Sequence, residues 1–118
     1  PDAIRRACDH YLERGFTAIK FGWGVFGQDR KTDIALVKAA RETIGPDVAL
    51  MVDPGWKVER SAAEAIDLLH DLAPYDLTWL EDFLHPENVD GYARVKAAGL
   101  RTRIAAGEQE ATGWGFRE

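Results

Sequence analysis

Three acidic residues each close a run of mostly apolar residues, and they recur at nearly constant spacing. The residues are Asp53, Glu81 and Glu108; Glu81 follows Asp53 by 28 positions, and Glu108 follows Glu81 by 27. Short apolar runs at such intervals predict parallel strands, whose carboxyl ends form the face where α/β enzymes place their sites. Three converging carboxylates repel one another unless a cation lies between them. Mg²⁺ suits this role because it prefers oxygen ligands. The spacing therefore predicts a magnesium site.

Other interpretations of these acids remain open. No histidine or cysteine joins the set in the sequence, so zinc suits it less well. A single acid at the end of a strand often only caps a loop or the following helix. The threefold repetition favours a cation site over that alternative.

Lys20 ends the first predicted strand as the acids end theirs. Beside a metal-bound carboxylate substrate, a lysine can neutralise charge, or it can abstract a proton if its pKa is lowered. We therefore treat Lys20 as a candidate catalytic residue. The alternative is an ion pair with Asp53 or a solvated side chain.

Three residues are candidate substrate contacts. Trp23 lies in a glycine-rich segment, which forms either a pocket wall or a connection packed by its own rings. His85 lies in the loop after Glu81 and contacts either the substrate or the loop itself. Glu110 lies two residues beyond Glu108 and is expected to line the same mouth.

Alternating helices and strands must position these side chains. Amphipathic periodicity predicts helices at 3–14, 33–44, from 61 onward and at 88–98, with parallel strands at about 16–21, 48–53, 77–81 and 103–108. Ser61 and Glu64 have the spacing of a capping box that opens the third helix. The alternation predicts an α/β fold with a parallel sheet. Periodicity leaves open a doubly wound sheet or part of a (β/α)₈ barrel, which needs about 250 residues.

Composition limits the function classes. The 118 residues are 46% hydrophobic and 30% charged, with a net charge of −5, which is typical of a globular protein that does not bind nucleic acid. The single cysteine and the lack of a signal peptide or a membrane-spanning run favour a cytoplasmic protein. The first and last residues both read as cut ends, so we expect residues 1–118 to be one segment of a domain.

Four short motifs together resemble a known family. They are Ala-Ile-Lys at 18–20, Met-Val-Asp at 51–53, Trp-Leu-Glu-Asp at 79–82 and Ala-Gly-Glu-Gln at 106–109. They resemble the barrel domain of the enolase superfamily, especially the mandelate racemase and muconate-lactonising-enzyme branch with its acid-sugar dehydratases. The resemblance covers essentially the whole chain.

The resemblance implies that residues 1–118 are a segment of a (β/α)₈ barrel. It implies Mg²⁺ on Asp53, Glu81 and Glu108 at the ends of the third, fourth and fifth barrel strands, with Lys20 at the end of the second. The implied chemistry is abstraction of the proton α to a carboxylate, giving an enediolate stabilised by Mg²⁺. In sugar-acid members, loss of the β-hydroxyl completes a dehydration.

Two departures from the family pattern qualify this hypothesis. Gly22 stands where many members carry a second lysine, the base, and Phe83 stands where a proline is common. The alternative base, a His–Asp pair on later strands, would lie beyond residue 118. A racemase or epimerase of the same branch, a non-catalytic metal-binding module and an incomplete half-barrel therefore remain alternatives. Because a half-barrel exposes sheet edges, we expect a homo-oligomer.

Overall fold

The computed structural model describes residues 1–56 and 60–117. Helices and strands alternate along the chain, which confirms the predicted α/β class. The elements in order are α1 (Asp2–Glu13), β1 (Ala18–Gly22), α2 (Arg30–Ile44), β2 (Ala49–Asp53), α3 (Ala62–Leu72), the 3₁₀ helix η1 (Ala73–Tyr75), β3 (Trp79–Glu81), α4 (Val89–Ala97), β4 (Arg103–Ala105) and the 3₁₀ helix η2 (Gly115–Arg117).

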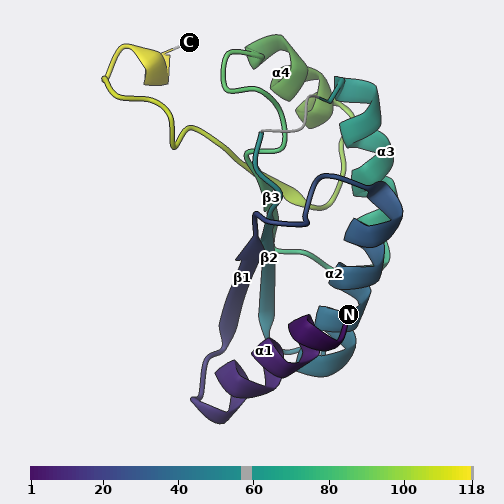
Figure 1. Ribbon diagram of the computed structural model, residues 1–118. Helices are drawn as coiled ribbons and strands as arrows, with labels where there is room; N and C mark the ends of the chain where they lie inside the picture. The colour runs from purple at the N-terminus through teal and green to yellow at the C-terminus, as the bar shows by residue number, and fades with distance from the viewer. Residues whose placement is uncertain (57–59, 118) are drawn as a thin grey trace.

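The four strands form one parallel sheet in the order β1-β2-β3-β4. Helices α1 and α2 pack side by side, as do α2 and α3, and α3 and α4, along one face of the sheet (Figure 1). No described α-helix covers the opposite face (Figure 1). A parallel sheet with helices on one side is the arrangement of a barrel wall.

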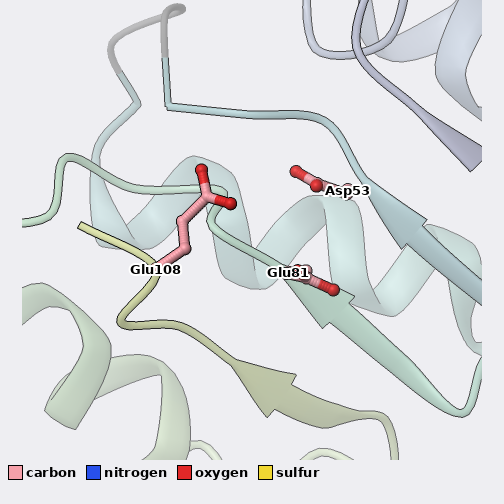
Figure 2. Close-up of side chains that lie close together, drawn as sticks. All are labelled: Asp53, Glu81 and Glu108. Carbon is pink, nitrogen blue, oxygen red and sulfur yellow. The ribbon is translucent and has the colours of Figure 1, made fainter. Parts of the chain in front are cut away.

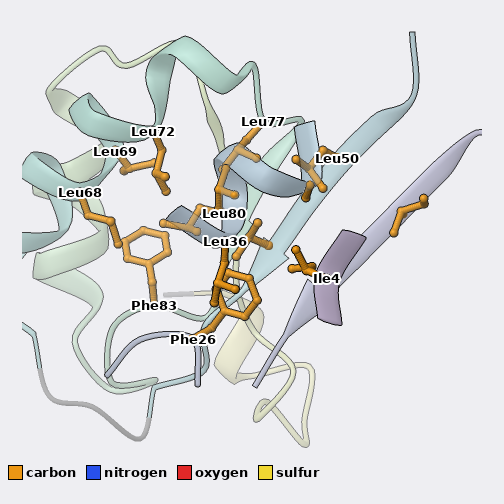
Figure 3. Packing of buried hydrophobic residues seen from close by; sticks show 14 of the residues in the cluster. Ile4, Phe26, Leu36, Leu50, Leu68, Leu69, Leu72, Leu77, Leu80 and Phe83 are labelled. Atoms are coloured by element: carbon orange, nitrogen blue, oxygen red, sulfur yellow. The ribbon is translucent and has the colours of Figure 1, made fainter. Parts of the chain in front are cut away.

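The hydrophobic core lies between the sheet and the helices (Figure 3). Because side chains alternate along a strand, Ile19, Leu50, Val52 and Leu80 all reach this layer and are buried. Residues from the helices and from the loop after β3 complete the core: Leu36, Val37, Leu68, Leu69, Leu72 and Phe83. The other set of strand residues, which includes Lys20 and Trp79, therefore faces away from the helices.

The helix boundaries follow their caps. Ser61 and Glu64 form the predicted capping box, each side chain accepting from the other residue's backbone N–H. Helix α2 begins three residues before the predicted start at 33, because the side chain of Asp29 caps it by accepting from Thr32 N at 2.8 Å. Helices α1 and α4 lie within one or two residues of their predicted bounds.

The strands are shorter than predicted. β1 begins at Ala18 rather than 16, because Phe16 N bonds back to Tyr11 O of α1 at 3.1 Å. β1 continues to Gly22, so the prediction that Lys20 ends this strand was wrong by two residues. The predicted strand 103–108 was wrong in extent, since β4 ends at Ala105 and Gly107 has φ +111°. Glu108 therefore lies on a loop and does not alternate along a strand.

None of the described helices is long and apolar enough to cross a membrane.

Candidate metal centre

Three carboxylates meet at the carboxyl ends of the strands. Asp53 is the last residue of β2, Glu81 is the last residue of β3, and Glu108 lies three residues beyond β4. One oxygen from each lies within 4.8 Å of the other two, and the side chains lie close together in Figure 2. Asp53 is buried, Glu81 is half-buried and Glu108 is exposed, so the group opens outward.

The strand register explains the meeting of the first two acids. Met51 pairs with Trp79 across β2 and β3, so two residues further along each strand Asp53 lies opposite Glu81. Glu81 pairs with Ala105 on β4, and Glu108 reaches the group through the turn at Gly107. The sequence therefore predicted the meeting of the three acids but not the loop that brings in Glu108.

Lys20 joins the acidic group from β1. Its Nζ lies 2.7 Å from Glu81 Oε1 and 3.5 Å from Asp53 Oδ2. The hydrogen bond to Glu81 is the main cause that raises the pKa of Lys20, against the opposing effect of burial. Burial alone would raise the pKa of Glu81, but the hydrogen bonds from Lys20 and Trp79 outweigh it and lower that pKa. Lys20 is therefore an ammonium ion in this arrangement.

Neutral donors also hold the acids. Asp53 accepts from the indole Nε1 of Trp23 at 3.1 Å and from Gly55 N at 3.1 Å. Glu81 Oε2 accepts from Trp79 Nε1 at 2.7 Å. Sequence reasoning missed Trp79, although its place two residues before Glu81 puts both side chains on one face of β3.

Asp82, also missed, follows Glu81 directly in the sequence and is buried. It is 3% exposed, it has φ +43°, and its Oδ1 accepts from Gly107 N at 3.3 Å. Burial, followed by the charges of Glu108, Asp53 and Glu81, raises the pKa of Asp82. Asp82 therefore ties the end of β3 to the turn that presents Glu108. An acid immediately after a strand-end acid was the signal that could have revealed it.

The structure gives His85 and Glu110 other neighbours than the three converging acids. His85 packs edge-to-face against Trp56, with ring centroids 5.4 Å apart, and its Nδ1 accepts from Glu87 N. Glu110 is exposed, lies against Gly115 and is not among the converging acids. At Gly22, a Cβ atom would lie 2.1 Å from Asp53 O, so no side chain fits there without a backbone shift.

A buried ion pair connects the loops around the centre. Asp33 of α2 and Arg60, after β2, lie 3.9 Å apart and have side chains only 4% and 10% exposed. Asp33 also accepts from Gly27 N, and Arg60 donates to the carbonyl oxygens of Gly27 and Phe83. These contacts tie together the loops that follow β1, β2 and β3.

The donor set fits Mg²⁺. All three converging ligand atoms are carboxylate oxygens, as hard divalent cations require. Three acidic side chains face one described cation, Lys20, and Glu108 forms no ion pair with any described residue. A divalent cation would relieve the remaining repulsion.

Comparison with known proteins gives a family match and a similar protein of known name. The profile of a family described as enolase C-terminal domain-like matches residues 3–118. Over 117 residues the chain is 41% identical to a D-galactarolactone cycloisomerase of Agrobacterium fabrum (strain C58), a match that covers 91% of this chain and 28% of that protein.

Solved structures extend the comparison. A racemase from Streptomyces coelicolor A3(2) with bound magnesium has a TM-score of 0.85 at 34% identity, covering 98% of this chain and 31% of that one. An L-talarate dehydratase from Polaromonas sp. JS666, complexed with Mg and L-glucarate, has a TM-score of 0.77 at 32% identity, covering 91% and 29%. The neighbours are (β/α)₈ barrels, so the barrel-segment prediction is confirmed over the doubly wound alternative. The chain spans less than a third of the length of these relatives.

Proposed function

The chain belongs to the enolase C-terminal domain-like family, and we propose that it supplies the Mg²⁺ site of an enzyme that removes the proton α to a substrate carboxylate. The ligands are Asp53, Glu81 and Glu108. One observation carries the proposal: these carboxylates converge to within 4.8 Å at the strand ends of a barrel segment of this family.

The metal and the surrounding residues would have different roles in this reaction. When bound, Mg²⁺ supplies positive charge that stabilises the charge developing on the substrate carboxylate. Lys20, an ammonium ion beside Glu81, adds a second positive charge and can donate a hydrogen bond to the same carboxylate. Trp23 and His85 extend from the loops after β1 and β3, where a substrate would be enclosed.

Neither Lys20 nor position 22 supplies the base that takes the α-proton, and we place that base outside the described residues. Position 22 has no room for a side chain beside Asp53, and the hydrogen bond to Glu81 keeps Lys20 protonated.

We infer a sugar-acid substrate, whose β-hydroxyl leaves as water after proton removal to give a 2-keto-3-deoxy acid. The similarity to an L-talarate dehydratase supports this reaction.

Cycloisomerisation of a sugar-acid lactone is the second candidate. The 41% identity to a D-galactarolactone cycloisomerase favours it. We propose removal of the proton α to the carboxylate as the first step of this reaction too. A racemase that uses a base on each face of the substrate fits less well, because Gly22 supplies no base.

The test uses the full-length protein that contains this chain, with Mg²⁺, sugar acids and their lactones in D₂O. Dehydration converts an open-chain sugar acid into a 2-keto acid that is lighter by one water, whereas cycloisomerisation converts a lactone into an isomer of the same mass. Deuterium exchange at the α-carbon without either product indicates racemisation. Absence of all three reactions across the panel, with and without Mg²⁺, would contradict the proposed function.

A further inference from the structure

Two tryptophan side chains donate hydrogen bonds to two of the three proposed magnesium ligands. Trp23 Nε1 lies 3.1 Å from Asp53 Oδ2, and Trp79 Nε1 lies 2.7 Å from Glu81 Oε2. The two indoles come from β3 and from the loop after β1, so they approach the centre from separate elements. We propose that Trp23 and Trp79 are positioning residues that fix these carboxylates for Mg²⁺; the inference rests on the proposed function.

The backbone of Trp23 supports this role. Its φ of +60° is strained for a bulky residue, and such strain persists only where the surroundings impose it. Trp23 N donates to Asp53 O at 2.9 Å while the indole donates to the carboxylate of the same residue. Main chain and side chain thus hold Asp53 at two points.

Trp79 fixes Glu81 from the side opposite Lys20. Lys20 takes Oε1 and Trp79 takes Oε2, so both oxygens of the carboxylate are hydrogen-bonded. An indole N–H is a donor without charge. It orients the carboxylate without repelling a dication. A second lysine at this place would repel the dication.

Glu108, unlike Asp53 and Glu81, accepts no hydrogen bond from a described tryptophan. It is exposed, and its hydrogen bond to a described side chain comes from its neighbour Gln109 at 3.2 Å. The centre therefore has two ligands oriented in advance and one that adjusts. Mg²⁺ requires near-ideal octahedral geometry, whereas Ca²⁺ tolerates irregular sites. The indoles should consequently contribute more to Mg²⁺ binding than to Ca²⁺ binding.

The experiment removes each N–H from the full-length protein. Calorimetric titration compares Mg²⁺ and Ca²⁺ affinity in wild type, Trp23→Phe, Trp79→Phe and the control Trp114→Phe, whose residue is 74% exposed and stacks on Arg117. Loss of a partner that orients a metal ligand typically weakens metal binding about 10- to 100-fold. We expect that loss for Mg²⁺ in the first two variants, a smaller loss for Ca²⁺ and none in the control. Thermal unfolding verifies that each variant is folded.

A second substitution separates the hydrogen bond from ring packing. The variant Trp23→benzothienylalanine keeps the bicyclic ring and lacks the N–H, so it should bind Mg²⁺ as weakly as Trp23→Phe does. Unchanged Mg²⁺ affinity in this variant, or an equal loss in Trp114→Phe, overturns the positioning role while leaving the magnesium site intact. Failure of the wild-type protein to bind Mg²⁺ overturns the proposed function and this inference together.

Discussion

The ammonium of Lys20 reaches past the end of β2 to the carboxylate of Glu81 on β3, with Nζ 2.7 Å from Oε1. The same Nζ lies 3.5 Å from Asp53 Oδ2. Lys20 thus neutralises two of the three converging acids in part. It has the same charge sign as the proposed metal and lies against two of the proposed ligands.

Lys20→Met should therefore tighten Mg²⁺ binding while it abolishes most of the turnover. Removing a half-exposed ion-pair partner changes the interaction by up to about 1 kcal/mol, or about three- to fivefold in affinity. Calorimetry on the full-length protein measures the affinity, and a steady-state assay measures turnover. Lys38→Met, which breaks an exposed pair with Glu42, is the control. Weaker Mg²⁺ binding in Lys20→Met would show that the lysine does not compete with the metal.

Glu81→Gln keeps the shape of the side chain and removes its charge. Loss of a direct ligand should weaken Mg²⁺ binding by more than the roughly 100-fold seen when outer partners are lost. At 100 times the wild-type dissociation constant, Mg²⁺ should stabilise the wild type by about 2.7 kcal/mol and the variant by less than about 0.4 kcal/mol. Unfolding with and without Mg²⁺ measures both. Glu110→Gln is the matched control, because Glu110 lies outside the converging group. Equal stabilisation of Glu81→Gln and wild type would refute the ligand assignment.

Gly22→Ala should destabilise the protein and weaken Mg²⁺ binding. The new Cβ would lie 2.1 Å from Asp53 O and 2.8 Å from Asp53 Cβ, so the end of β2 must shift. Overpacking of this kind costs about 1–3 kcal/mol. Gly22→Lys should suffer the same shift and gain no base activity. Urea unfolding measures the cost, with Gly113→Ala as the control, since a Cβ there meets open space. A Gly22→Ala protein as stable as wild type would contradict this close approach.

Much of the centre was readable from local sequence. Apolar runs ending in Asp53 and Glu81 predicted two strands and the edge where they end, and the Ser61–Glu64 spacing predicted a helix start. Each of these signals depends on residues a few positions apart. The extent of β4 was misjudged because the left-handed turn at Gly107 overrides the alternating pattern.

The supporting contacts were not readable in this way. Trp23 meets Asp53 across 30 positions, and Arg60 meets Gly27 across 33. Such pairs are determined by how the loops pack, and a single sequence carries no periodic signal for them. The same holds for the pair of Arg60 with Asp33, a residue that reads locally as an ordinary helix-start acid.

Arg60→Met should be among the most destabilising single changes in the chain. It leaves Asp33, whose side chain is 4% exposed, without its cationic partner, and breaking a buried pair costs about 3–5 kcal/mol. Burial already raises the pKa of Asp33, so its charge is costly without Arg60. The double variant Asp33→Asn/Arg60→Met should recover part of the loss. Urea unfolding tests this, with Arg101→Met in an exposed pair as the control. A double variant less stable than Arg60→Met would contradict an uncompensated charge.

Tyr92→Phe should change the stability of the protein at alkaline pH. The Tyr92 hydroxyl donates to Leu84 O at 3.0 Å and accepts from Leu84 N at 3.2 Å, which fixes the loop after β3. Burial, with smaller contributions from the charges of Asp82 and Asp53, raises the pKa of Tyr92 to about 12. An unfolded tyrosine has a pKa of about 10, so the folded protein holds this proton more tightly.

The sign of the effect follows from that difference. The stabilisation is complete below about pH 10 and disappears as the pH rises towards about 12. Between pH 9 and about 11.5, Tyr92→Phe should therefore lose less stability than wild type. At neutral pH the variant should be about 1 kcal/mol less stable than wild type, because the Leu84 N–H and C=O groups both lose a partner. Urea unfolding at several pH values measures both effects, and Tyr75→Phe is the control, since the Tyr75 hydroxyl bonds no described residue. If wild type and Tyr92→Phe lose stability in parallel up to about pH 11.5, ionisation of Tyr92 contributes nothing to alkaline unfolding.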